Sequence, residues 1–175
     1  LEEAVLPSGL SSLGDHAFAN CTSLVAVNLE DTALNAIGSR CFMNCTSLKR
    51  IYIPGNIKTI NNEAFSGCSA VNALTLSEGV KTLGGACFAD CVSLSEVTIP
   101  RSVSSAGASS SKGPFTGCAN LTNVTFAEKT RLVPQYLFYG CGQLTEITLP
   151  DTVSEIGAYA FYNCTNLESV NVPSA

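Results

Sequence analysis

The chain has 175 residues, of which 46% are hydrophobic and 13% are charged. This composition is typical of one folded domain with a sizeable core, and it excludes a disordered tail. Nine lysine and arginine residues against fourteen aspartate and glutamate residues leave a net charge of −5, which argues against a general binder of nucleic acids or anionic membranes. With His16 as its single histidine, the chain also lacks the residues for most metal sites and most histidine-dependent catalysis.

A short alternating run opens the chain and recurs along it. The opening run is LEEAVLP at residues 1–7, and comparable runs include LKRIYIP at 48–54, LSEVTIP at 94–100 and LTEITLP at 144–150. Their apolar residues fall at the first, fourth and sixth positions, and positions four to six carry the period-two signal of a strand with one buried face. The sequence predicts eight such strands.

Between one strand and the next lies a second apolar pair and then a motif with phenylalanine and cysteine. In four repeats a glycine precedes the motif, at Gly14, Gly38, Gly84 and Gly157, where we expect a tight backbone turn. The motif A-F-x-x-C spans about one helical turn and should direct both Phe and Cys inward. Its phenylalanines are Phe18, Phe42, Phe65, Phe88, Phe115, Phe138 and Phe161, with spacings of 24, 23, 23, 27, 23 and 23 residues.

This regular spacing identifies a repeat protein. One repeat alone buries too little apolar surface to offset the entropy of ordering its residues, so the repeats must stack on one another. Adjacent strands are then parallel and roughly 4.8 Å apart.

The complete frame is A-F-x-x-C-x-x-L-x-x-V/I-x-L/I-P-x-x-V/L-x-x-I/L-G, and it resembles the BspA-like leucine-rich repeats, also called the Treponema-type class. Departures are local: Asn61 and Pro134 replace the glycine, and Val71 replaces the leucine. The resemblance implies a right-handed, curved α/β solenoid with about eight parallel strands on one face, short helical turns and irregular convex segments. It further implies a surface or secreted protein of a bacterium or protist, a class in which several members are adhesins for host proteins.

We expect residues 1–175 to form a single repeat domain of seven to eight repeats. Residues 102–113, SVSSAGASSSKG, lengthen one repeat by about four residues. Their composition predicts a flexible loop on the convex side, more typical of a tolerated insertion than of a binding loop. Neither end of the chain carries an evident polar cap, so we expect a segment of a longer protein.

The nine cysteines all occupy inward positions of the repeat, with Cys41 and Cys87 standing where other repeats have alanine. This placement predicts a ladder of small buried thiols. A zinc site is disfavoured because the chain has no C-x-x-C motif. A disulfide between Cys41 and Cys45, or between Cys87 and Cys91, is geometrically marginal at a spacing of four residues in a tight turn.

Asparagine stands two residues after the phenylalanine in three repeats, at Asn20, Asn44 and Asn163. Each begins an N-C-T sequence that matches the glycosylation acceptor pattern. Because the middle cysteine points inward, the repeat itself explains these sequences better than glycosylation does. We expect the asparagine side chains to satisfy backbone groups at the turn.

The outward positions of the predicted sheet are mostly small and polar, and one repeat differs from the others. Lys49, Arg50 and Tyr52 project together from it. Because Arg and Tyr are enriched at binding hot spots, these three residues are the favoured contact patch for a partner. Ordinary solvated surface residues are the alternative.

Glu96 and Glu146 share one outward column two repeats apart, with Asn123 between them. Strand spacing places their Cα atoms roughly 9.6 Å apart, near the upper end of the separation in an inverting glycosidase. Nothing in the sequence indicates a pocket between them. We therefore interpret both as solvated residues that can contribute to partner binding.

Four tyrosines form two in-register pairs near the C-terminal end: Tyr136 with Tyr159, and Tyr139 with Tyr162. The pattern predicts side chains stacked along the solenoid, which is favoured over a site for a sugar or peptide. The four residues are kept as a secondary candidate for partner binding.

The favoured hypothesis is a non-catalytic extracellular or cell-surface recognition module that mediates protein–protein interaction, with adhesion to host matrix proteins suggested by the resemblance. We expect no enzymatic activity, because no nucleophile–base or metal constellation is evident. No cofactor, nucleic-acid partner or membrane insertion is expected in this segment. Two alternatives stay open: a structural spacer of a surface protein, and an accessory binding domain of a larger secreted enzyme.

Overall fold

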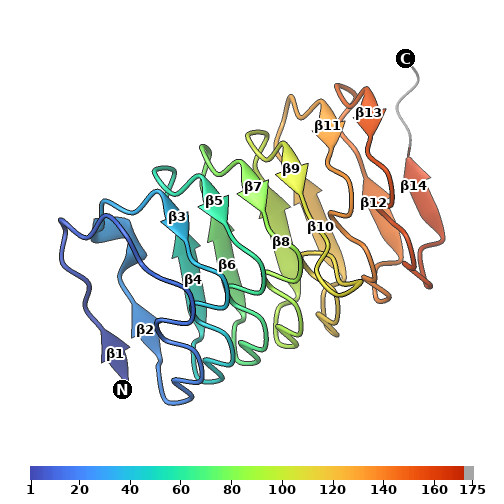
Figure 1. The fold of residues 1–175 in the computed structure, drawn as a ribbon. Helices are drawn as coiled ribbons and strands as arrows, with labels where there is room; N and C mark the ends of the chain where they lie inside the picture. The colour runs from blue at the N-terminus through green and yellow to red at the C-terminus, as the bar shows by residue number, and fades with distance from the viewer. Residues whose placement is uncertain (172–175) are drawn as a thin grey trace.

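The computed structural model describes residues 1–171, which wind into a solenoid of about seven turns (Figure 1). Each turn contributes one strand to what we call the long-strand face. Its eight strands are β1 (Glu3–Ala4), β2 (Ala26–Val27), β4 (Arg50–Ile53), β6 (Ala73–Leu76), β8 (Glu96–Ile99), β10 (Asn123–Phe126), β12 (Glu146–Thr148) and β14 (Ser169–Asn171). The eight strands predicted from the sequence are confirmed.

Shorter strands form a second face, the short-strand face, which lies across the solenoid from the first (Figure 1). They are β3 (Ala36–Ile37), β5 (Thr59–Ile60), β7 (Thr82–Leu83), β9 (Ser105–Ala106), β11 (Leu132–Val133) and β13 (Glu155–Ile156). The second apolar pair of the repeat supplies their buried residues, such as Ile60 and Leu83.

All strand pairs are parallel, as predicted, but the ladders are not continuous. On the long-strand face β1 pairs with β2, β4 with β6, β8 with β10, and β12 with β14. Strands β6 and β8 lie side by side without a ladder between them, and so do β10 and β12. Register places Tyr52 opposite Thr75, and it places Glu96 opposite Asn123 as the predicted outward column requires.

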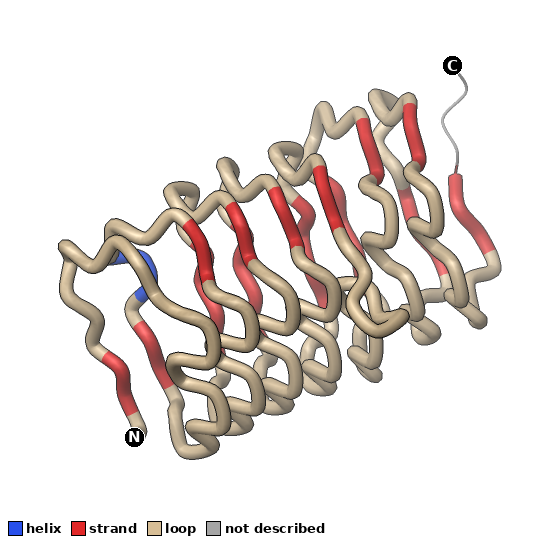
Figure 2. The backbone as a smooth tube through the Cα atoms, in the orientation of Figure 1, coloured by secondary structure: helices blue, strands red, loops and turns tan. Residues whose placement is uncertain are grey.

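The predicted helical turns are wrong, and with them the α/β class. Within residues 1–171 the one helix is a 3-10 segment at Leu29–Asp31, and the A-F-x-x-C segments are loops (Figure 2). The backbone has positive φ two residues before and two residues after the phenylalanine, for example +55° at Arg40 and +59° at Asn44. A right-handed helix needs negative φ throughout, so the motif folds into successive tight turns.

These tight turns, which we call the turn edge, also join neighbouring repeats. The N–H of Cys45 donates to the carbonyl of Phe42 within the turn, at 3.2 Å. The N–H of Phe42 donates to the carbonyl of Ala64 in the next repeat, at 2.7 Å. Hydrogen bonds within the turn alternate with hydrogen bonds to the next repeat along the motif. The turn edge therefore forms a third ladder of backbone hydrogen bonds between repeats.

The left-handed conformation explains the asparagines of the N-C-T sequences. Asn20 and Asn44 have φ of +61° and +59°, and asparagine tolerates this region better than most residues. Glycine occupies the same position in other repeats, as at Gly67. We expected these side chains to hydrogen-bond to the backbone of the turn. Asn44 instead bonds to the asparagine of the preceding repeat, because its Nδ2 donates to Oδ1 of Asn20 at 3.0 Å.

The prediction that the glycines before the motif form a tight turn is also wrong. None of Gly38, Gly84 and Gly157 has positive φ. Each instead lies against the backbone of the preceding repeat: a Cβ at Gly84 would stand 2.5 Å from the carbonyl carbon of Asn61. Glycine is needed here for close approach between repeats.

A stack of phenylalanine rings fills the core at the turn edge. Six consecutive ring pairs from Phe18 to Phe161 have centroids 5.1–6.0 Å apart and planes within 22° of parallel. The rings between the two ends of the stack are fully buried. The predicted inward direction of Phe is confirmed.

The long repeat contains an ordered hairpin rather than the expected flexible loop. Ser109 and Lys112 exchange backbone hydrogen bonds of 2.9 and 2.8 Å around a two-residue tip. Ser109 Oγ donates to Glu63 Oε1 at 3.0 Å, and Lys112 Nζ lies 2.8 Å from Asp90 Oδ2. The hairpin is therefore held back against the turn edge of the preceding repeats.

Candidate interaction surfaces

The cationic patch lies on β4 of the long-strand face. Along this strand Arg50 and Tyr52 are exposed while Ile51 and Ile53 are buried, because successive side chains of a strand point to opposite sides. Lys49, just before the strand, is also exposed. No side-chain hydrogen bond or ion pair engages these three residues within the described chain, so their polar groups are available to a partner.

The two carboxylates lie further along the same face. Glu96 begins β8 and Glu146 begins β12, both exposed, with Asn123 on the strand between them. The face thus carries positive charge on β4 and negative charge on β8 and β12. A partner that matches this face needs negative charge opposite β4 and positive charge opposite β8 and β12.

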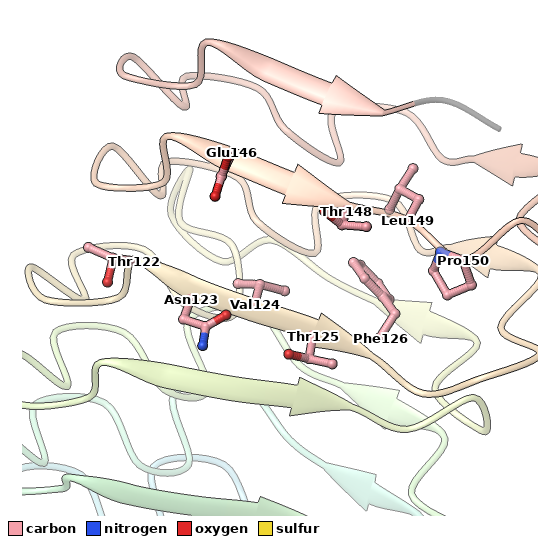
Figure 3. A pocket seen from close by; sticks show the side chains of 9 residues that line it. All are labelled: Thr122, Asn123, Val124, Thr125, Phe126, Glu146, Thr148, Leu149 and Pro150. Atoms are coloured by element: carbon pink, nitrogen blue, oxygen red, sulfur yellow. The ribbon is translucent and has the colours of Figure 1, made fainter.

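Two hollows open on this face, and the sequence analysis predicted neither of them. The first has a volume of about 610 Å³ and lies between β10 and β12, where Phe126 and Glu146 line it (Figure 3). The second, of about 240 Å³, lies between β6 and β8 and is lined by Glu96 among others. Both occur where the hydrogen-bond ladder is missing, a feature of tertiary packing that the repeat pattern does not encode.

The hollows do not bring the two carboxylates into one site. Glu146 lines the first hollow and Glu96 the second, while Asn123 lines both. A pair of catalytic carboxylates must flank one scissile bond. The separation therefore agrees with the interpretation of Glu96 and Glu146 as surface residues.

The tyrosines stack as predicted. The ring centroids of Tyr136 and Tyr159 are 5.2 Å apart, and those of Tyr139 and Tyr162 are 5.0 Å apart. The hairpin lies beside the rings, which the sequence did not predict: Ala108 and Ser111 line the same cleft as the four tyrosines. The 27-residue spacing from Phe88 to Phe115 was the sequence signal for the insertion that forms the hairpin.

The cysteines form the predicted ladder of thiols, and all nine are free. In six repeats the thiol donates to the carbonyl of the phenylalanine in the preceding repeat, as Cys68 does to Phe42 at 3.2 Å. Burial raises the pKa of Cys68 to about 12 and that of Cys45 to about 11. Because the thiolate is the reactive form, these groups are core residues without nucleophilic character.

Alkylation of the native protein should therefore label few cysteines. Cys21 and Cys164 are half-buried and the other seven are buried, so we expect iodoacetamide at neutral pH to modify those two first. Mass spectrometry of peptides from native and urea-unfolded protein measures this. Equal labelling of Cys68 in both states would contradict the buried ladder.

Within residues 1–171 no group of three or more His, Cys, Asp or Glu side chains is placed to hold a metal ion. Among the same residues, no helix has the length and apolar character to cross a bilayer.

The parallel strands, stacked phenylalanines and recurrent leucines define a leucine-rich-repeat solenoid. The chain matches the BspA type leucine-rich repeat region, in six copies over residues 1–113 and 109–175. It belongs to this family, as the sequence resemblance indicated. Comparison with curated proteins found no match.

Solved structures of bacterial leucine-rich repeat proteins share the fold. One from Bacteroides ovatus is 30% identical with a TM-score of 0.67, over 98% of this chain and 49% of its own. The T. pallidum protein is 28% identical with a TM-score of 0.72, over 96% and 78%. A leucine-rich cell surface protein from Faecalibacterium prausnitzii is 27% identical with a TM-score of 0.64, over 97% and 47%. The chain thus spans about half the length of the first and third.

Proposed function

We propose that this domain is a non-catalytic recognition module at the outer surface of a cell, which binds a protein through its long-strand face. The proposed partners are matrix proteins of a host. The observation that carries it is the exposed group of Lys49, Arg50 and Tyr52 on a strand whose other side is anchored in the core.

The geometry of the face supports binding of a macromolecule. Eight parallel strands form an extended surface that is largely polar, and the two hollows add relief to it. An Arg and a Tyr side by side provide the kind of anchor that dominates protein interfaces. The carboxylates of Glu96 and Glu146 then favour one orientation of a charged partner.

The family supports the same class of function. Leucine-rich repeats are a general protein-interaction fold, and the similar F. prausnitzii protein is described as a cell surface protein. The chain spans about half of that protein. Location at the cell surface and adhesion are therefore proposed for this chain on the basis of similarity.

Binding to immobilised fibronectin and fibrinogen tests this function. The variant Lys49→Ala/Arg50→Ala/Tyr52→Ala should bind at least about tenfold more weakly than the unchanged domain, because hot-spot residues each contribute more than about 1 kcal/mol. The control Lys81→Ala/Arg131→Ala removes two exposed cations beside the short strands β7 and β11. It should bind like the unchanged domain.

The other results point to the alternatives. Equal loss in both variants would indicate a nonspecific charge effect, and retention in the triple variant would place the contact elsewhere. Absence of saturable binding to either protein would favour a spacer, or an accessory domain of a larger secreted enzyme.

A further inference from the structure

The four tyrosines and the hairpin form a cleft of about 320 Å³ on the turn edge, away from the long-strand face. We name it the tyrosine cleft; its lining residues are Ala108, Ser111, Tyr136, Tyr139, Tyr159 and Tyr162. We propose that the tyrosine cleft is a binding site for a neutral carbohydrate. This inference is separate from the proposed protein contact on the long-strand face.

The repeat itself does not require tyrosine at these positions. Two residues before the phenylalanine, other repeats have His16, Arg40, Glu63 or Ala86, all with the same positive φ as Tyr136 and Tyr159. Four of the five tyrosines in the chain nevertheless gather here. Since other repeats stack without tyrosine at this position, the fold does not require the cluster.

The rings form an array that presents aromatic surface in more than one direction. Tyr136 and Tyr159 are parallel to within 5°, whereas Tyr136 and Tyr139 are tilted by 52°. Tyr159 and Tyr162 retain 54% and 55% of their surface exposed. No tyrosine hydroxyl makes a hydrogen bond within residues 1–171, so all four are free to bond a ligand.

The insertion supplies a firm wall to this array. Glycines let it approach closely: a Cβ at Gly113 would stand 2.8 Å from Cβ of Tyr139, and one at Gly85 would stand 2.8 Å from Cα of Ala108. The contacts of Ser109 with Glu63 and of Lys112 with Asp90 hold the hairpin in place. The insertion and the tyrosine cluster, two separate departures from the repeat, thus meet at one cleft.

The chemistry of the lining identifies the ligand class. No charged residue lines the cleft, which disfavours an ionic ligand. Aromatic faces suit the apolar C–H face of a sugar ring, while phenol and serine hydroxyls both donate and accept hydrogen bonds as sugar hydroxyls do. A proline-rich peptide also docks on aromatic grooves, but its carbonyls only accept hydrogen bonds from the hydroxyls of the lining, whereas sugar hydroxyls both donate and accept. The volume is near the lower end of the range for small-ligand sites, about 300–1,000 Å³, which suits a short oligosaccharide segment.

Intrinsic fluorescence offers a direct test because the chain contains no tryptophan and four of its five tyrosines line the cleft. The probes are a panel of neutral oligosaccharides of glucose, galactose, mannose and N-acetylglucosamine, titrated to millimolar concentration. We expect at least one to change the tyrosine emission saturably. The variant Tyr159→Ala/Tyr162→Ala should weaken its affinity about tenfold or more, measured by calorimetry.

Matched variants separate this site from the long-strand face and from misfolding. Tyr52→Ala removes a tyrosine ring that is also exposed, by 47%, and should leave carbohydrate affinity unchanged. Tyr136→Phe keeps the ring and removes one hydroxyl, so a smaller loss than with the double alanine variant is expected. Circular dichroism should show the same fold for all three variants.

Absence of binding by every sugar in the panel would overturn the proposal, as would unchanged affinity in the Tyr159→Ala/Tyr162→Ala variant. Saturable binding of a proline-rich peptide without any sugar binding would overturn it in favour of a peptide site. Loss of matrix-protein binding in the Lys49, Arg50 and Tyr52 variant bears only on the long-strand face.

Discussion

Replacing Phe88 with alanine should lower the free energy of unfolding by about 3–5 kcal/mol. The Phe88 ring is fully buried and stacks between those of Phe65 and Phe115, with centroids 5.5 Å away on both sides. Its loss leaves a cavity in the middle of the stack and removes two aromatic contacts. Urea unfolding monitored by circular dichroism measures the change.

Phe18→Ala is the matched control for Phe88→Ala. Phe18 occupies the same repeat position but is only half-buried, and within the described residues it stacks on Phe42 alone. We expect a loss at least about 1 kcal/mol smaller, because less area and one fewer aromatic pair are removed. Equal losses at the two positions would contradict the view that stacking between repeats stabilises the fold.

Gly84→Ala should destabilise the protein by about 1–3 kcal/mol. The new Cβ would stand 2.5 Å from the carbonyl carbon of Asn61 and 2.6 Å from the amide nitrogen of Asn62. Both are backbone atoms that cannot rotate away, so the two repeats must separate locally. The melting temperature, measured by differential scanning calorimetry, should fall accordingly.

Gly14→Ala makes the same substitution at the equivalent position of the first repeat. A Cβ at Gly14 has no neighbour within 4 Å and the residue lacks positive φ. Since alanine restricts the unfolded chain more than glycine does, we expect unchanged or slightly higher stability. A similar fall in melting temperature for both variants would show that the glycine serves local turn conformation rather than contact between repeats.

The candidate surfaces differ in how far the sequence predicts them. Alternation along β4 is enough to place Arg50 and Tyr52 outward, because a strand anchored by Ile51 and Ile53 has one possible orientation. The equal spacing of Tyr136 and Tyr159 likewise predicts their stacking. The hollows beside Glu96 and Glu146 were missed, since they depend on which neighbouring strands hydrogen-bond.

The turn edge shows why a local pattern can mislead. Phe and Cys three residues apart suit one turn of helix, yet the backbone alternates between right- and left-handed conformations around Phe42. Forward hydrogen bonds to the next repeat, such as that from the Phe42 N–H to Ala64, take up donors that a helix would use internally. The recurrence of Asn, Asp and Gly at the position of Asn44 was the available signal for this conformation.

The sequence by itself determined the repeat length, the parallel strands and the inward Phe and Cys side chains, because these follow from periodicity and from the need of each repeat to bury its apolar residues. Tertiary structure decided the rest. Close approach between repeats explains Gly84, and side-chain contacts to Glu63 and Asp90 order residues 109–112. The meeting of that hairpin with Tyr139 depends on contacts between different turns of the solenoid, which no local pattern encodes.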